Sequence, residues 1–341
     1  MDPSSTKLQF TYPAGHPLGV PGGTVTVNLI YGSVIQWPYR VGATGVIPWN
    51  AGGWIDRTLV IGGYDNQVFP LTSLTPGASE REAHSTIWEI TNPLASTWTI
   101  PAGYGAMAHR RVFCNAVITP DLKVIVFGGS ANFFCPYNAG GTQVDPLPVL
   151  VPEMLDLLNP APGWVPLSPH ASARLYHSIA LLLKDGRILV GSGYKATTAL
   201  VNPPLIHTDA EIFTPPCLMQ GLARPTITNP QSQIGDIHYG QPIPQLKISL
   251  EGSSTPANDI EFATLIRCGS VTHHFDADQR CIRLDVTAAG GNLISLATLP
   301  SMAQGGHFIA PPGLYLLFVV TTLRGNPLVR VPSVSRFVRI S

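Results

Sequence analysis

The segment ARLYHSIALLLKDGRILVGSG, residues 173–193, has the pattern of a β-hairpin. A turn at residues 184–187 (KDGR) separates the apolar run at residues 179–183 from a second run that ends in Gly193. Two apolar runs joined by a tight Asp-Gly turn are a strong hairpin signal. Because the apolar residues are continuous rather than alternating, we expect both faces of this hairpin to be buried.

Two earlier segments end in the same way. Residues 57–63 (RTLVIGG) and 123–129 (KVIVFGG) share with residues 187–193 a basic residue, an apolar core and a glycine turn. The second and third repeats are preceded by residues 111–115 (RVFCN) and 174–178 (RLYHS), and the first has a weaker counterpart at residues 39–44 (YRVGAT). Hairpins that repeat and bury both faces predict the blades of a kelch-type β-propeller.

Three blades do not close a propeller, which takes about four to eight. An open array exposes sheet edges and apolar blade faces. We therefore expect either that the repeats are incomplete here or that a second chain completes the propeller.

The pattern changes after residue 213. A proline-rich linker at residues 214–228 is followed by short apolar segments at the spacing of a β-sandwich. These segments are residues 245–250, 259–267, 281–287, 293–299, 314–321 and 335–340. No amphipathic helix is evident. The sequence thus predicts an all-β chain, with a partial propeller over residues 1–221 and an immunoglobulin-like (E-set) domain over residues 222–341.

Composition narrows the classes of partner. The chain has 20 basic and 20 acidic residues, a formal net charge of +0 and only 12% charged residues. Without a basic cluster, we expect neither nucleic acid nor an anionic membrane surface as a partner. No apolar run is long enough to span a membrane. The first residues (MDPSSTKLQF) have no apolar signal-peptide core, so we expect a cytosolic chain or a piece of a larger protein.

The 5 cysteines form no CxxC pair, and their odd number leaves at least one thiol outside any intrachain disulfide. Cys268 and Cys281 could pair, but buried free thiols are the favoured interpretation.

Tyr176, His177 and His273 are the candidate metal ligands. Two imidazoles with a phenolate oxygen suit copper(II) in a tetragonal site. Neighbours on a regular strand point to opposite faces, so Tyr176 and His177 can share a metal only at an irregular strand start. They lie just before the apolar run, where such an irregularity is possible. By the same rule, we expect at most one of His273 and His274 to face a single site.

Several segments, in this order along the chain, resemble the copper radical oxidases, the family of galactose oxidase and glyoxal oxidase. They are residues 173–193, 210–218 (AEIFTPPCL), 224–228 (RPTIT), 265–280 (LIRCGSVTHHFDADQR), 310–320 (APPGLYLLFVV) and 331–340 (VPSVSRFVRI). Residues 98–129 and 42–63 resemble the preceding blades more weakly. The resemblance covers the C-terminal portion of the family only. It implies a kelch propeller followed by an immunoglobulin-like domain, one loop of which brings a copper ligand to the propeller axis.

The resemblance also implies roles for the candidate residues. Tyr176 matches the family's axial tyrosine, which acts as general base, and His177 and His273 match its two histidine ligands. The implied reaction is the oxidation of a primary alcohol or aldehyde by O₂ with release of H₂O₂, in an extracellular protein. The family's redox-active tyrosine and its thioether-linked cysteine have no match here, and neither Cys114 nor Cys135 lies at a suitable position. We therefore expect an incomplete copper site, with weak copper binding and little turnover by this chain alone.

Two alternatives stay open. The chain is either a non-catalytic kelch and immunoglobulin-like protein that binds carbohydrate or protein, or the product of a truncated gene.

Overall fold

The computed structural model confirms the all-β fold class. It describes residues 10–11, 24–25, 29–30, 33–36, 39–40, 54–55, 58–65, 87–90, 103–132, 146–195, 205–229, 233–323 and 326–341. Helical structure within these ranges is limited to α1 (Gly306–Ile309) and the single turns η2 (Pro216–Leu218), η3 (Pro256–Asp259) and η4 (Met302–Gln304). None of the helices in the described ranges is long and apolar enough to cross a membrane.

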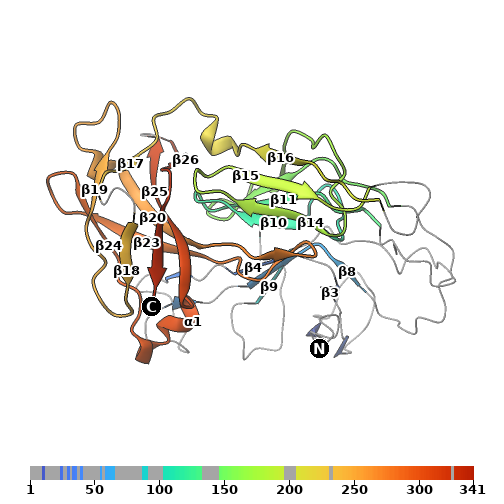
Figure 1. Ribbon diagram of the computed structural model, residues 1–341, viewed down its shortest axis with the longest axis horizontal. Coiled ribbons are helices and arrows are strands. Elements are labelled where there is room, and N and C mark those ends of the chain that lie inside the picture. The colour runs from blue at the N-terminus through green and yellow to red at the C-terminus, as the bar shows by residue number, and fades with distance from the viewer. Residues whose placement is uncertain are drawn as a thin grey trace.

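Three small antiparallel sheets form the blades of the N-terminal region (Figure 1). The first contains β4 (Ser33–Gln36), β7 (Thr58–Ile61) and β9 (Ile87–Ile90). The second contains β10 (Asn115–Ile118), β11 (Lys123–Phe127), β12 (Glu153–Asp156) and β13 (Val165–Pro166). The third contains β14 (Ser178–Leu182), β15 (Ile188–Ser192) and β16 (Ala210–Phe213). Strands β4, β10 and β14 lie side by side as the innermost strands of the three sheets.

The hairpins predicted at β10–β11 and β14–β15 are present, but the partner expected in the first repeat is wrong. Strand β7 pairs with β4, upstream of residues 39–44. Within that range, β5 (Tyr39–Arg40) pairs with β6 (Trp54–Ile55) instead. Two further short ladders of the N-terminal region join β1 (Phe10–Thr11) to β2 (Thr24–Val25) and β3 (Leu29–Ile30) to β8 (Tyr64–Asp65).

The glycine pairs that end β7 and β11 are contact points between blades. The Gly129 N–H donates to the Arg174 carbonyl at 2.7 Å, and the Gly63 N–H donates to the Arg111 carbonyl at the same distance. Gly128 has a φ of +59°, and a Cβ placed there would lie 2.3 Å from the Arg174 carbonyl oxygen. Only glycine permits both this backbone conformation and this close approach. The repeated double glycine therefore marks where the next blade docks.

Burial of both blade faces is confirmed in the second sheet. Val117 and Ile125 pack with Ile188 in a core shared with the third blade. On the opposite face, Ile118 and Val124 join a core shared with the first blade and the C-terminal domain. A blade sandwiched in this way needs apolar residues at consecutive positions, which explains its unbroken apolar runs.

The main sheet of the C-terminal domain is curled and has 9 strands. Its order is β17-β19-β24-β23-β20-β25-β27-β18, with β26 paired to β25. Strand β23 (Cys281–Ala288) pairs with β20 (Ile260–Arg267) through its first part and with β24 (Leu293–Leu296) through its last residues. The other strands are β17 (Thr226–Ile227), β18 (Gln233–Ile237), β19 (Leu246–Ser249), β25 (Gly313–Leu323), β26 (Asn326–Pro332) and β27 (Arg336–Ile340). The two layers of the predicted sandwich are thus parts of one sheet that folds over its own core.

This domain packs firmly against the blades. Along β20, Ala263 and Leu265 face the core of the curled sheet, whereas Phe262 and Ile266 enter the core shared with the first two blades. Because β20 contributes to both cores, the orientation of the domain is fixed relative to the propeller.

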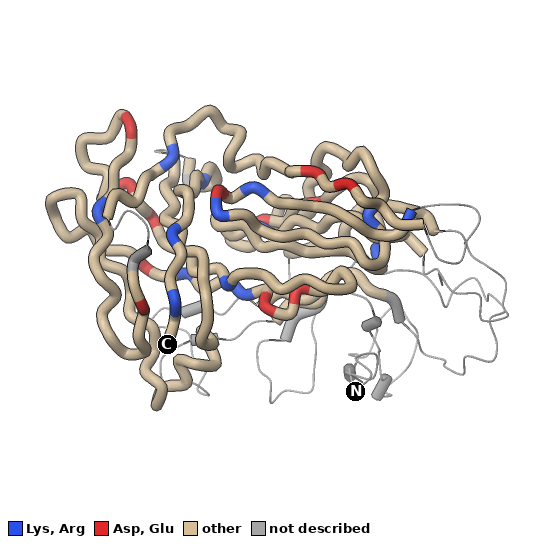
Figure 2. The backbone as a smooth tube through the Cα atoms, in the orientation of Figure 1, with Lys and Arg blue, Asp and Glu red and all other residues tan. Residues whose placement is uncertain are grey.

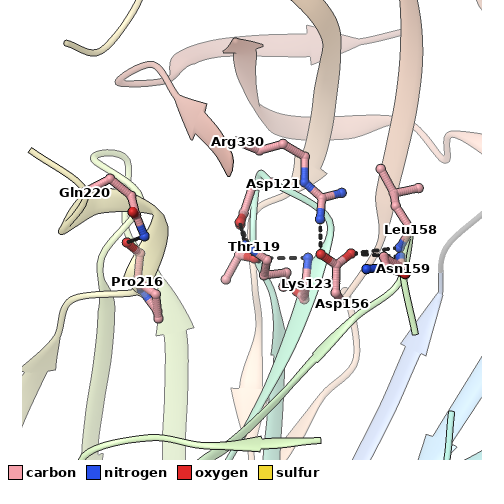
Figure 3. A network of polar contacts seen from close by, with 9 residues as sticks. All are labelled: Thr119, Asp121, Lys123, Asp156, Leu158, Asn159, Pro216, Gln220 and Arg330. Carbon is pink, nitrogen blue, oxygen red and sulfur yellow. Dashed lines mark hydrogen bonds and ion pairs between the residues drawn. The ribbon is translucent and has the colours of Figure 1, made fainter. Parts of the chain in front are cut away.

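Polar contacts support the same junction at the turn ends of the blades (Figure 3). Arg330 on β26 is 2% exposed and forms an ion pair with Asp156 on β12. In the neighbouring turn of the second blade, Asp121 accepts hydrogen bonds from the Thr119 hydroxyl at 2.6 Å and the Lys123 ammonium at 2.7 Å. Elsewhere along the described chain, charges of both signs are interspersed (Figure 2).

Candidate metal centre

Tyr176 and His177 lie in an irregular turn that ends where β14 begins. His177 has a φ of +66°, and the Ser178 N–H donates to the Leu175 carbonyl at 2.9 Å to close the turn. The rings of Tyr176 and His177 stack with their centroids 4.1 Å apart. The left-handed residue prevents the alternation that an extended strand would impose, so two adjacent side chains share one side.

His273 comes from a hairpin of the C-terminal domain, β21 (Val271–Thr272) and β22 (Phe275–Asp276). This hairpin extends from the curled sheet to lie beside β14 on one side and β4 on the other (Figure 1). Its two-residue turn is formed by His273 and His274, whose φ values are +54° and +62°. Positive φ at both central residues defines a type I′ turn, for which asparagine and glycine are the usual residues.

The base of this hairpin is held closely against the blades. A Cβ at Gly269 would lie 2.8 Å from Leu181 of β14 and 2.6 Å from Asp276. Gln279 donates to the Ala116 carbonyl at 3.1 Å, and its own carbonyl accepts from the Gln36 N–H at 3.0 Å. These contacts with two different blades position the tip of the hairpin at the beginning of β14.

The structure brings the three predicted ligands together. The ring centroids of His177 and His273 are 4.5 Å apart, and those of Tyr176 and His273 are 5.7 Å apart. The described residues include no group of three or more His, Cys, Asp or Glu side chains that could hold a metal ion. A site here therefore depends on the phenol oxygen of Tyr176 together with the two imidazoles. Two nitrogens and one oxygen suit copper(II), and metal binding stays a prediction.

His274 also lies beside Tyr176, and the expectation that at most one of the two adjacent histidines faces a single metal site stays a prediction. His274 is 3% exposed, and its ring centroid lies 5.7 Å from that of Tyr176, the same separation as for His273. Both rings lie beside Tyr176 because the two left-handed residues of the type I′ turn do not alternate as strand residues do.

The electrostatic environment favours the neutral form of two imidazoles of this cluster, those of His177 and His274. Burial lowers the pKa of His177, and the neighbouring His273 lowers it further. Burial lowers the pKa of His274 to about 3, with smaller contributions from the other two histidines. A neutral ring keeps one nitrogen lone pair available for a metal. At His273, the Nδ1 atom lies 2.6 Å from the Thr272 hydroxyl oxygen.

Comparison with known proteins shows what this chain is similar to. Residues 224–340 match the family model described as "Galactose oxidase-like, Early set domain". The chain is 31% identical over 267 residues to a galactose oxidase of Gibberella zeae, an alignment covering 77% of this chain and 34% of that protein. It is 28% identical over 246 residues to the aldehyde oxidase GLOX1 of Arabidopsis thaliana, covering 69% and 36% of the two chains. The chain is copper radical oxidase-like. It spans about a third of the length of these curated relatives.

A solved structure extends the likeness of this copper radical oxidase-like chain to the blades. A fungal alcohol oxidase in complex with copper superposes with a TM-score of 0.64 at 23% identity, covering 94% of this chain and 56% of that one. This match concerns the fold. The early-set match begins at residue 224, near the predicted start of the second domain, and the division at residues 221 and 222 stays a prediction.

Sequence reasoning missed two aromatic neighbours of the cluster. The Phe113 ring lies 5.2 Å from Tyr176, and the Tyr194 ring lies 5.1 Å from His177. Both side chains are buried, at 2% and 4% exposed, and they give the cluster apolar walls. Phe113 lies two residues after Arg111 in an apolar stretch, and Tyr194 directly follows Gly193. Neither position carries a sequence signal for a metal site.

The described cysteines are buried or partly buried thiols. Cys114, Cys217, Cys268 and Cys281 are all free, so the possible Cys268–Cys281 disulfide does not form. Burial raises the pKa of the Cys114 thiol to about 11, and its Sγ lies 3.7 Å from the Ile61 carbonyl oxygen. A thiol with a raised pKa is a poor nucleophile and metal ligand. Cys135 lies outside the described residues.

Proposed function

We propose that this chain binds copper through Tyr176, His177 and His273 and provides part of the active site of an alcohol or aldehyde oxidase. The observation that carries the proposal is the meeting of these rings, within 4.1–5.7 Å of one another, from two separate domains. The galactose oxidase and aldehyde oxidase similarities support a small alcohol, aldehyde or carbohydrate as the substrate.

Each ligand has a distinct task in this proposal. Copper, when bound, supplies Lewis acidity and one-electron redox chemistry. The imidazoles of His177 and His273 would hold it through their nitrogen lone pairs. The phenol oxygen of Tyr176, when deprotonated, accepts the proton of the substrate hydroxyl, the task of a general base. Phe113 and Tyr194 exclude water from one side of the cluster.

We further propose that this chain alone turns over weakly. Its sequence offers no match to the family's redox-active tyrosine and cysteine, so a copper ion held here would lack its one-electron partner. A second polypeptide that completes the propeller would cover the open face of the third blade. That face includes Ile212, which is 48% exposed. By comparison, Val117 and Ile125 lie on the face of the second blade that the third blade covers, and both are fully buried. The family resemblance favours an extracellular location.

The test is copper binding by the full chain, followed by an oxidase assay. We expect about one copper(II) per chain, with weaker binding in His177→Ala and His273→Ala. His238→Ala is the matched control, because His238 is exposed and lies beside Ser341 in the C-terminal domain. Peroxide release with galactose and with a small aldehyde should be near background. Unchanged copper affinity in both ligand variants would overturn the site, and sustained peroxide release would overturn the weak-turnover proposal.

A further inference from the structure

We propose that Thr272 is a positioning residue that fixes the tautomer of His273, and this inference rests on the proposed copper site. The Thr272 hydroxyl oxygen lies 2.6 Å from His273 Nδ1. A neutral imidazole carries one N–H, and the other ring nitrogen has the lone pair. With Nδ1 engaged by Thr272, Nε2 is the nitrogen left for copper. It can bind only if the proton resides on Nδ1 and is donated to the hydroxyl.

The backbone around this pair is held in place from both sides. Thr272 is the last residue of β21 and lies opposite Phe275 of β22 in the hairpin register. The two turn residues between them have positive φ, a conformation that is costly for histidine. An asparagine or glycine would form the same turn with less strain. Histidine at such a strained position is expected where the side chain itself has a role.

His274 anchors the turn on the side away from solvent. Its ring packs edge-on against Phe113 at 5.5 Å and tilted against Tyr176 at 5.7 Å. The His273 ring is more exposed, and its ring contacts are with the two other proposed ligands, His177 at 4.5 Å and Tyr176 at 5.7 Å. Ring packing does not distinguish the two nitrogens of the His273 imidazole, whereas the contact between the Thr272 hydroxyl and Nδ1 does. This contact therefore selects the tautomer of His273, as outer-shell partners of metal-bound histidines generally do.

The opposite tautomer of His273 would have a different consequence for metal binding. If the hydroxyl donated to Nδ1, the proton would reside on Nε2, and His273 would present an N–H rather than a lone pair to His177, whose ring lies 4.5 Å away. That arrangement cannot bind copper through Nε2.

The first experiment needs no copper. Nitrogen-15 NMR of the histidine side chains in the metal-free full chain distinguishes the two tautomers, with His273→Ala used to assign the signal. We expect the Nδ1–H form in the wild type and in Thr272→Ser, which keeps the hydroxyl. Thr272→Val, which matches threonine in shape but lacks the hydroxyl, should shift the population toward Nε2–H. An Nε2–H form in the wild type, or a population that does not change in Thr272→Val, would overturn the inference.

The second experiment measures copper(II) affinity by competition with a chelator. Loss of an outer-shell partner typically weakens metal binding by about 10- to 100-fold. We expect a loss of this size in Thr272→Val and near wild-type affinity in Thr272→Ser. Since Thr272 is exposed, the urea unfolding midpoint of both metal-free variants should match the wild type.

Comparing His273→Ala with Thr272→Val separates the test of the copper site from the test of the role of Thr272. If His273→Ala weakens copper binding but Thr272→Val does not, the role of Thr272 is overturned and the copper site stands. If neither substitution changes the affinity, the copper site itself is overturned, and the inference falls with it.

Discussion

Substituting Gly128 by alanine tests whether the blades dock through glycine. A Cβ at this position would lie 2.3 Å from the Arg174 carbonyl oxygen and 2.7 Å from the Arg174 Cβ. Ordinary van der Waals contacts begin near 3.4 Å, so the two blades would have to separate locally by about 1 Å. The adjacent hydrogen bond from the Gly129 N–H to the Arg174 carbonyl, at 2.7 Å, would be strained or lost.

The expected destabilisation is the sum of three effects. Placing alanine at a φ of +59° costs about 1–2 kcal/mol. Overpacking a close contact costs about 1–3 kcal/mol. Losing one backbone hydrogen bond costs about 1 kcal/mol. We therefore expect Gly128→Ala to lower the free energy of unfolding by about 3–6 kcal/mol.

Gly163 provides the matched control. It has a φ of +77°, and a Cβ there would meet no atom within 4 Å. Gly163→Ala should therefore cost only the backbone contribution of about 1–2 kcal/mol. Urea unfolding followed by tryptophan fluorescence measures both variants. Equal losses in the two variants would refute the reasoning, because the contact with Arg174 would then add nothing to the backbone strain.

Two further predictions concern buried polar groups of the blades. Burial beside Phe127 lowers the pKa of His170 to about 4, so the wild type should lose about 3 kcal/mol of unfolding free energy as the pH falls from 6.5 to 4. Urea unfolding across this range should show a smaller pH dependence in His170→Phe, and an unchanged dependence would contradict the assigned pKa. The fully buried Arg174 forms ion pairs with two carboxylates, one of them Glu211 at 2.7 Å, so Arg174→Met should destabilise by about 2–3 kcal/mol. Arg187→Met, which removes a half-exposed ion pair, should cost less than about 1 kcal/mol, and equal losses in the two variants would contradict the account.

Much of the fold could be predicted because the packing of one blade on the next requires particular residues at repeated positions. The glycine pairs at residues 62–63 and 128–129 are needed for close docking of the next blade, and continuous apolar runs are needed for burial on both faces. In the first blade the prediction failed, because β4 (SVIQ) lacks the arginine that precedes the other two hairpins. Strand β26 also escaped prediction, since its two prolines are unusual within a sheet.

The site was only partly predictable for a related reason. The position of Tyr176 and His177 before an apolar run indicated an irregular strand start, and the left-handed φ of His177 provides it. The presence of His274 in the cluster depends on a type I′ turn at a His-His sequence, which turn propensities do not favour. The role of Thr272 depends on a side-chain distance that no sequence pattern reports.

The most direct test of the copper site is the electron paramagnetic resonance spectrum of the full chain loaded with one equivalent of copper(II). If Tyr176, His177 and His273 share the metal, the wild type should show hyperfine coupling to two imidazole nitrogens. His177→Ala and His273→Ala should each show coupling to one. The same number of coupled nitrogens in all three proteins would contradict the site.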